Sequence, residues 1–334
     1  MGFGRFLLKR SLHGLIVIWG VVTVVFFLRF ATPGSPITFM VPLEASQELR
    51  RQIARELGLN QPIYVQYGDY LWNLLHLDMG RSYISGTSVS QQVFSRLPVS
   101  IELAVAATIV AISLSIPLGV ISATNRHEPA DYGATTFSLL GISTPNFWLG
   151  LTLVLVFSVV FGLFPTSGVA TLQGKSVLFT DAVRLAISGQ PVWLLRWLSH
   201  IVLPAITLGT YFTALITRLT RSGMLDELGK QYVRALRAKG LPETLVRYRH
   251  ALKNTLIPII TILGLQLGLL IGGAVITEAV FDWPGLGTLL VNSIYKRDWM
   301  MIQGCLIVIG TGFVIINIVV DALHAYVDPR VVTE

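Results

Sequence analysis

Histidine and cysteine side chains are few and scattered along this chain of 334 residues, which limits the chemistry it could perform. Its six histidines form no His-x-x-x-His pair, and its single cysteine, Cys305, has no second thiol with which to form a disulfide. A metal site needs several ligands held together, and a catalytic nucleophile needs an adjacent base. The sequence therefore predicts no metal site and no enzyme active site in this chain.

One segment has the composition of a phosphate-binding loop, with Gly168, Gly174, Lys175 and Ser176 in order. A phosphate loop has four residues between its two glycines, whereas five separate Gly168 from Gly174. We therefore interpret residues 168–176 as a flexible polar turn, and we expect no ATP-hydrolysing site in this chain.

Ionisable side chains within the apolar parts of the sequence would indicate an ion-driven carrier, because such groups mark ion pathways in membranes. Glu102, Arg218 and Glu278 lie near the ends of apolar runs, where we expect them to reach water. Asp321 lies at the end of the last run, and we expect it to pair locally rather than to carry protons. The sequence thus disfavours a proton- or sodium-driven pump.

The elements that hold these residues are predicted from composition, since 53% of the residues are hydrophobic and only 13% are charged. About 20 apolar residues in a helix cross a bilayer, and a soluble enzyme or a disordered chain would not contain such runs. We predict an all-α integral membrane protein with six transmembrane helices: Leu12–Leu28, Ile101–Ser122, Phe137–Phe164, Ile201–Leu219, Leu256–Val280 and Ile302–Val320.

Basic residues predict the orientation of these helices. Arg5, Lys9 and Arg10 precede the first run, and nine of the chain's 25 lysines and arginines lie between Arg218 and Lys253. Because basic loops stay on the cytoplasmic side, we expect both segments, and therefore both termini, in the cytoplasm. The net charge of +7 is then a signal of topology, and we expect a lipid bilayer and no nucleic acid as a partner.

The predicted layout follows from these runs. The first run is longer than the apolar part of a cleavable signal peptide, so we favour an uncleaved anchor helix. We predict four parts: an N-terminal anchor helix (1–31), an extracytoplasmic segment (32–100), a core transmembrane domain with a cytoplasmic loop at 222–254 (101–326), and a cytoplasmic tail (327–334).

Two details of the predicted helices depend on local sequence. Ser143-Thr144-Pro145 interrupts the third run, where proline removes a backbone hydrogen bond and predicts a kink. Ala182–Ile187 and Val192–Leu198 are predicted as short helices at the outer membrane interface. The second of them contains two tryptophans, and tryptophan is enriched at membrane interfaces.

Gly264, Gly268 and Gly272 follow one another at intervals of four residues in the fifth run, so they share one helical face. Small residues at this spacing let two helices approach closely in lipid. The partner of this face is either another helix of the same chain, which we favour, or a second membrane subunit.

Between the fourth and fifth runs, residues 222–254 have the pattern of two helices joined by a tight turn, and we name them the hairpin segment. Ser222–Lys239 lacks proline and has apolar side chains at helical intervals, Gly240 provides a helix stop, and Glu243–Asn254 forms the second helix. A short helix held out from the membrane in this way suits docking into a groove on a partner.

Two runs of the hairpin segment, Arg234-Ala-Leu-Arg-Ala-Lys-Gly-Leu241 and His250-Ala-Leu-Lys-Asn254, carry a family resemblance. They are similar to the permeases of ATP-driven importers, specifically to the dipeptide, oligopeptide and nickel branch. The general signature of these permeases is Glu-Ala-Ala, three residues, Gly, nine residues and Ile-x-Leu-Pro. Here the first position holds Arg234 in place of Glu, and Lys253 stands in place of the proline.

A second stretch, Thr277–Gly287, resembles the motif that follows the fifth span in this branch. Leu57–Pro62 and Asp78–Ser82 resemble its first outside segment. The resemblance implies a position near the outer gate for six residues: Glu278, Phe281, Trp283, Pro284, Gly285 and Gly287.

The resemblance implies a type I importer permease whose hairpin segment couples it to other subunits. Two cytoplasmic ATPase subunits would hold ATP and magnesium, so no cofactor is expected in this chain. A second, homologous permease subunit would complete a heterodimeric pore, and an extracytoplasmic binding protein would deliver the substrate. The residues implied to contact the ATPases are Arg234, Ala235, Leu236, Ala238, Lys239, Gly240 and Leu241.

Peptides are the substrate that the resemblance favours, and the alternatives within the same machinery are nickel, glutathione and oligosaccharides. An ion-coupled secondary carrier or channel is a distant alternative that predicts uptake without an ATPase partner. An intramembrane enzyme would need a nucleophile paired with a base, or a metal set, inside the spans, and we find neither in the sequence.

Overall fold

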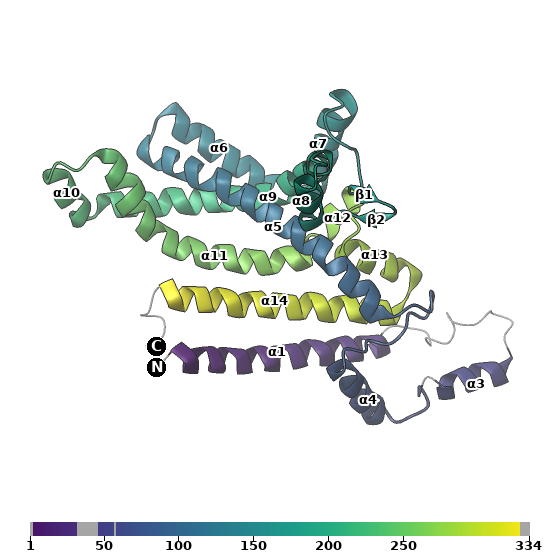
Figure 1. Cartoon of the computed structure of the whole chain (residues 1–334). Coiled ribbons are helices and arrows are strands. Elements are labelled where there is room, and N and C mark those ends of the chain that lie inside the picture. The colour runs from purple at the N-terminus through teal and green to yellow at the C-terminus, as the bar shows by residue number, and fades with distance from the viewer. Residues whose placement is uncertain (1–2, 32–45, 57, 328–334) are drawn as a thin grey trace.

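A computed structural model describes residues 3–31, 46–56 and 58–327 (Figure 1). Within these residues the chain is mainly helical, with one two-stranded sheet. In chain order the elements are α1 (Phe3–Ala31), α3 (Gln47–Glu56), α4 (Ile63–Leu75), α5 (Val89–Thr124), α6 (Pro129–Ser143), α7 (Asn146–Leu153), the π-helix η1 (Val154–Val160), β1 (Thr171–Leu172), β2 (Lys175–Ser176), α8 (Phe179–Ile187), α9 (Val192–Gly229), α10 (Gln231–Ala238), the π-helix η2 (Leu245–Ala251), α11 (Leu252–Gly273), α12 (Val275–Val280), α13 (Leu286–Lys296) and α14 (Trp299–Val327).

Four helices, α1, α5, α9 and α14, are long and apolar enough to cross a membrane. Two bent pairs, α6 with α7–η1 and η2 with α11, pass the same test and raise the number of spans to as many as six. The six predicted runs overlap these four helices and two pairs, so the predicted helical membrane architecture is confirmed. Figure 1 shows α1, α14 and α11 side by side, and α1 and α11 both pack against α14.

The first turn of α1 and the last turn of α14 lie at the end of the molecule that carries α10 (Figure 1). At this end Arg10 of α1 donates to the carboxylate of Asp321 on α14. Asp321 is therefore paired, as expected, but its partner comes from the first helix rather than from its own neighbourhood in the sequence.

The third predicted span is broken rather than kinked. α6 ends at Ser143 and α7 begins at Asn146, and the two axes differ by 107°. Thr144 and Pro145 between them are extended, with ψ of 123° and 132°. Proline disfavours the helical conformation in the residue before it, so the chain leaves the helix at Thr144, and the prediction of one kinked helix is wrong.

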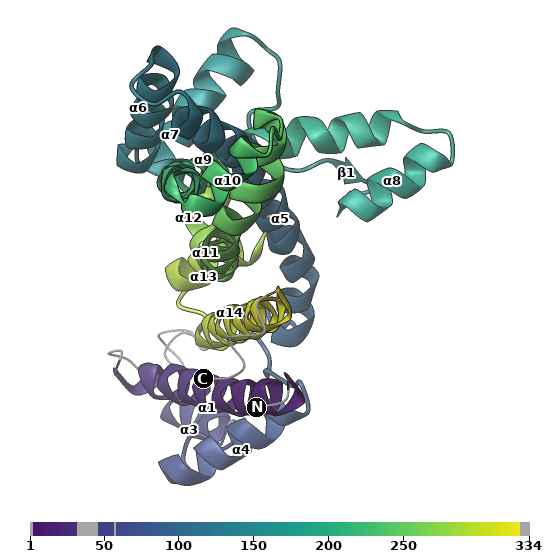
Figure 2. The ribbon, with the colours of Figure 1, turned by 90° about the vertical axis from the view of Figure 1, so that its left-hand side faces the viewer.

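The outer helices also differ from their prediction in one respect. α8 covers the first of the two predicted interfacial helices, but Val192–Leu198 forms the first turns of α9, which continues for 38 residues. No glycine lies between Leu198 and the predicted span at Ile201, so nothing in the sequence ends the helix there. Figure 2 shows α8 projecting away from the parallel helices.

The segment with the composition of a phosphate-binding loop forms a small β-hairpin. Thr171 pairs with Ser176 and Leu172 with Lys175 across an antiparallel ladder. Gln173 and Gly174 at its tip have φ of 51° and 77°, the left-handed conformation that two-residue hairpin turns require. Residues 171–176 thus form a β-hairpin with its turn at Gln173 and Gly174.

The main core lies between α5 and α9. Leu103 and Ala107 of α5 and Leu208 and Ile216 of α9 are buried together. The two backbones approach closely, because a Cβ on Gly209 would lie 2.8 Å from the carbonyl oxygen of Ala107. Such close approach favours van der Waals packing between membrane helices.

The glycine face of α11 packs against α14 of the same chain. A Cβ on Gly264 would lie 2.1 Å from Cγ1 of Val320, and one on Gly268 would lie 2.9 Å from Cδ2 of Phe313. The surroundings of Gly272 lie outside the described residues. Two of the three glycines therefore allow α11 and α14 to meet within one subunit.

We expect Gly264→Val to lower the free energy of unfolding by about 1–3 kcal/mol, because extra methyl groups in a tight interface force the neighbours apart. The measurement is the thermal midpoint of the purified protein in detergent. Gly264→Ala combined with Val320→Ala should lose less, since the opposing methyl groups are gone. An unchanged midpoint for Gly264→Val would show that α11 and α14 do not meet at this face.

Candidate functional site

The hairpin segment projects at one end of the row of long helices (Figure 1). The chain leaves α9, forms α10, turns at Gly240 and returns through η2 to α11. Gly240 has φ of +76°, a conformation that side chains strain. Its N–H donates to the carbonyl oxygen of Arg237 at 2.9 Å, and Leu241 N–H donates to that of Leu236 at 3.3 Å. The predicted glycine stop is therefore present.

The first arm of the hairpin segment is not the single helix predicted over Ser222–Lys239. α9 ends at Gly229, Lys230 is extended with ψ of 154°, and α10 begins at Gln231. Glycine has low helix propensity, and the carboxylate of Glu227 supplies interactions that fix the break. The break lets α10 turn away from the axis of α9.

Glu227 ties together the three elements at the base of the hairpin segment. Its carboxylate accepts hydrogen bonds from Lys230 Nζ, from Tyr232 Oη at 2.8 Å and from Asn254 Nδ2 at 3.4 Å. Asn254 Nδ2 also donates to Tyr232 Oη at 3.2 Å. Partial burial raises the pKa of Tyr232, and its hydrogen bond to Glu227 raises it further, so the phenol stays a donor. We name Glu227, Lys230, Tyr232 and Asn254 the base clasp.

A second set of contacts joins the two arms of the hairpin segment at its tip, next to Gly240. Glu243 accepts from Arg237 Nη2 at 2.7 Å and Nε at 3.1 Å, and from Arg247 Nε at 3.2 Å. The hydrogen bonds from Arg237, supported by Arg247, outweigh the opposing effect of burial and leave the pKa of Glu243 below its ordinary value, so the carboxylate stays ionised at neutral pH. The bidentate contact from Arg237 fixes the end of α10 to the second arm.

The hairpin segment has a buried side and an exposed side. Val233 of α10 and Val246 of η2 are fully buried. Leu236 and Leu241 are half-buried. The remaining residues that the sequence assigns to coupling are exposed: Arg234, Ala235, Ala238, Lys239 and Gly240.

The second arm adds two exposed apolar side chains to this end, Leu245 and Tyr248, of which Tyr248 is 55% exposed. A surface that mixes aromatic, aliphatic and basic side chains on a rigid helical hairpin is suited to docking against another protein. Sequence analysis did not single out these two residues, because they lie outside the glycine-centred signature.

We expect Glu227→Gln to loosen α10 while leaving the long helices folded, because hydrogen bonds to a charged group contribute about 1.5–3 kcal/mol. Amide hydrogen exchange in α10 should become faster by at least about tenfold, since local opening sets the exchange rate. Asp226→Asn is the matched control, because Asp226 is an exposed neighbour on the same helix. Equal protection of α10 in both variants would contradict a role for the base clasp.

A second cluster surrounds Glu278 in α12. Glu278 is 0% exposed, so the prediction that it reaches water is wrong. α11 ends at Gly273, and α12 begins a separate helix that turns the carboxylate inward. Ser100 Oγ donates to Glu278 Oε1 at 2.6 Å, and Thr288 N–H donates to Oε2 at 3.0 Å. Buried carboxylates need such donors.

The glycines of this motif leave room for the carboxylate. A Cβ on Gly285 would lie 2.3 Å from Glu278 Oε1, and one on Gly287 would lie 2.6 Å from Cα of Val275. The sequence pattern Glu-…-Gly-x-Gly is therefore explained by the folding of the α12–α13 connection over one acidic side chain.

The other motif residues anchor this connection to neighbouring elements. Buried Trp283 donates from Nε1 to the carbonyl oxygen of Val99 at 3.1 Å, and Arg96 Nη1 donates to that of Pro284 at 3.1 Å. The carbonyl oxygen of Phe281 accepts from Gly168 N–H at 2.7 Å. The structure thus brings all six predicted residues together against α5; we name them, with Ser100, the Glu278 cluster.

The described residues contain no group of three or more His, Cys, Asp or Glu side chains that could hold a metal ion. The hairpin segment and the Glu278 cluster differ in their exposure. The hairpin segment presents an exposed surface, whereas the Glu278 cluster is a buried joint between α5 and the α12–α13 connection.

Residues 115–333 match the model of a family described as binding-protein-dependent transport system inner membrane component, and residues 3–104 match the model of its N-terminal part. The chain is 40% identical over 327 residues to the oligopeptide transport system permease protein AppB of Bacillus subtilis, covering 98% of each chain. It is 36% identical over 339 residues to the dipeptide transport system permease protein DppB of Escherichia coli K12, again covering 98% of each.

Among solved structures, inward-facing conformations of the MetNI methionine ABC transporter contain a chain with a similar fold. The TM-score is 0.51 and the identity is 16%, over 69% of this chain and 93% of the other. This likeness supports the helical membrane architecture described above.

Proposed function

Since the chain belongs to the family of binding-protein-dependent transport inner membrane components, the permease subunits of ATP-binding-cassette importers, we propose that it forms part of a pore for di- and oligopeptides. The observation that carries the proposal is the match, over nearly the whole chain, to relatives named for oligopeptide and dipeptide transport. This chain is a transporter component rather than an enzyme, and its energy comes from subunits that hydrolyse ATP.

The hairpin segment is proposed as the contact with those ATPase subunits. Its exposed residues lie on a short helix, α10, which is fixed at its base by Glu227 and at its tip by Glu243. A displacement of α10 by an ATPase subunit would therefore displace α9 and α11 as well, because these contacts limit independent movement of the loop. ATP and magnesium are proposed to bind to the ATPase subunits and not to this chain.

Permeases of this family work with ATPase and substrate-binding partners. The full assembly proposed here contains two cytoplasmic ATPase subunits, an extracytoplasmic binding protein and a second, homologous permease that makes the pore a heterodimer. The apolar side chains exposed along α7 and η1, among them Trp148, Leu151 and Leu155, offer surface to lipid and to the second permease.

The proposed orientation places the hairpin segment and both termini in the cytoplasm. The support is that the basic start of α1, with Arg5, Lys9 and Arg10, lies at the same end as the basic hairpin segment (Figure 1). The positive-inside rule holds such segments on the cytoplasmic face of the membrane.

Uptake by the reconstituted transporter tests the proposed function. With the ATPase subunits, the second permease and the binding protein present in proteoliposomes, labelled di- and oligopeptides should accumulate only when ATP is supplied. If nickel, glutathione or oligosaccharide accumulated in place of peptides, the proposed substrate would be wrong, but the proposed ATP-driven mechanism would stand. Accumulation without ATPase subunits would overturn the proposal in favour of a secondary carrier.

A further inference from the structure

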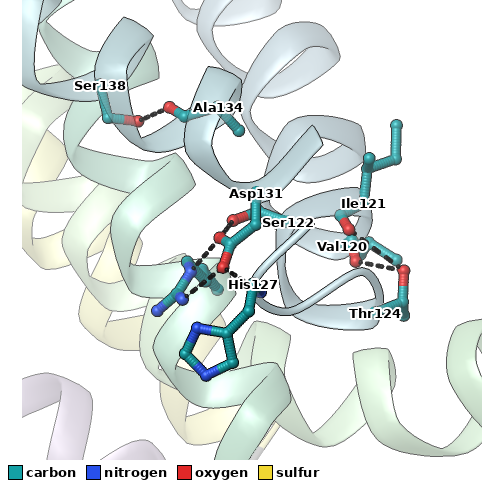
Figure 3. A network of polar contacts seen from close by, with 9 residues as sticks. Val120, Ile121, Ser122, Thr124, His127, Asp131, Ala134 and Ser138 are labelled. Atoms are coloured by element: carbon teal, nitrogen blue, oxygen red, sulfur yellow. Dashed lines mark hydrogen bonds and ion pairs between the residues drawn. The ribbon is translucent and has the colours of Figure 1, made fainter. Parts of the chain in front are cut away.

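The carboxylate of Asp131, in the first turn of α6, joins three separate parts of the chain (Figure 3). Oδ1 accepts from Ser122 Oγ on the last turns of α5 at 2.5 Å and from Arg221 Nε on α9 at 2.7 Å. Oδ2 accepts from Arg221 Nη2 at 2.9 Å and from His127 N–H in the α5–α6 turn at 3.1 Å. With four donors, this carboxylate, which is only 4% exposed, is fully satisfied.

The α5–α6 turn is shaped around this contact. His127 has φ of +66°, a strained conformation for a residue with a side chain, and it aims its N–H at Asp131. Pro129 begins α6, which places Asp131 close to the helix N-terminus, where negative charge is favoured. The turn and the helix start therefore both hold the carboxylate toward α9.

Arg221 lies on α9 just before the hairpin segment. Thr220 beside it packs so closely on α5 that a Cβ on Gly119 would lie 2.4 Å from its Cβ. Past Arg221, α9 continues without interruption to Glu227 in the base clasp. One rigid stretch of helix thus runs from the Asp131–Arg221 pair to the point from which α10 is held.

A buried ion pair is weak evidence of stability, because the cost of removing its charges from water offsets its attraction. Its geometry is nevertheless strict, since a bidentate guanidinium and carboxylate resist both sliding and rotation. Apolar contacts between α6 and α9 would tolerate sliding. This pair therefore fixes the relative positions of α5, α6 and the end of α9 in a way that apolar packing does not.

We propose that Asp131 and Arg221 are positioning residues that make α5 and α6 move with the hairpin segment when the ATPase subunits close. The inference rests on the proposed function, because it assumes that the hairpin segment receives the movement. It assigns to the pair a role in coupling: when the pair is broken, α10 still docks and ATP is still hydrolysed, but α5 and α6 do not follow.

The test is the number of peptides transported per ATP hydrolysed by the complete transporter in proteoliposomes. Asp131→Asn and Arg221→Lys should lower this ratio by about tenfold, within the range usual for coupling between sites, while ATP hydrolysis and co-purification of the ATPase subunits persist. The double variant should be no worse than either single one, because both act through one contact. Glu128→Gln and Arg218→Lys, exposed residues of the same turn and the same helix, should leave the ratio unchanged.

Three results would overturn the inference: an unchanged ratio, a proportional loss of transport and hydrolysis, or effects of the two single variants that add. Arg221→Lys retains the charge and most of the bulk of the side chain. The ratio of peptides transported to ATP hydrolysed can therefore still be measured on this variant if Asp131→Asn does not assemble. Failure of the proposed function is recognised separately, because the unmodified transporter itself would then show no ATP-dependent peptide uptake.

Discussion

Gly240→Pro is expected to abolish binding of the ATPase subunits while leaving the permease inserted in the membrane. Gly240 has φ of +76°, whereas proline is held near −65°. Proline also removes the N–H that donates to the carbonyl oxygen of Arg237. Since either conflict alone distorts the turn, the combined cost is about 3 kcal/mol or more, and the end of α10 leaves its position. ATPase co-purification and peptide uptake should both fall to background.

The matched control is Gly240→Asn, because asparagine tolerates the left-handed conformation better than other side chains do, and nothing lies within 4 Å of the added Cβ. This variant should retain most of the ATPase binding. A full complement of ATPase subunits on Gly240→Pro at the yield of the unmodified protein would refute the docking role of this turn.

Glu278→Leu is expected to have the second large effect, on the fold of the Glu278 cluster. The substitution leaves the buried donors Ser100 Oγ and Thr288 N–H without an acceptor. Each unsatisfied buried group costs about 1–3 kcal/mol, so the loss of an acceptor for both should lower the free energy of unfolding by about 2–6 kcal/mol. The thermal midpoint in detergent and the yield of assembled transporter should both fall.

Asp282→Asn is the control for Glu278, because Asp282 lies four residues further on, is exposed, and has φ of 49°, which asparagine accepts. Its midpoint should match that of the unmodified protein. If Glu278→Leu were as stable as Asp282→Asn, the carboxylate would not be the support of the α12–α13 connection.

The apolar runs predicted the long helices because crossing a bilayer requires length and low charge, and both are visible in one dimension. They did not predict where helices break or continue. α9 continues through Val192–Leu198 because no residue there stops it, and α6 separates from α7 because proline acts on the residue before it. These outcomes depend on local backbone preference and on packing together.

The hairpin segment was predictable in outline because a glycine stop and two helical patterns are local features. The base clasp was not, since Glu227 and Asn254 meet only after the chain has turned back. In the sequence Glu227 counts simply as one acidic residue among basic ones. Asn254 ends a run that resembles the family, so the sequence indicated that the residue matters, but it did not indicate the contact with Glu227.

Glu278 shows why position in a run is a poor guide to exposure. It lies near the end of a hydrophobic run, which suggests contact with water, yet the break at Ala274 folds it under Gly285 and against Ser100. The pairing of Asp131 with Arg221 is another contact across 90 residues. Both need the tertiary fold, because no periodicity relates the partners.

We propose that the exposed side of the hairpin segment contacts the ATPase subunits. A photo-crosslinking residue at Ala238, in the assembled transporter within native membranes, tests it most directly. The comparison position is Ile187, which is 84% exposed at the end of α8, a helix that lies far from α10 (Figure 1). We predict that crosslinking at Ala238 captures an ATPase subunit and that crosslinking at Ile187 captures none. Capture of the ATPase from Ile187, and not from Ala238, would contradict the account.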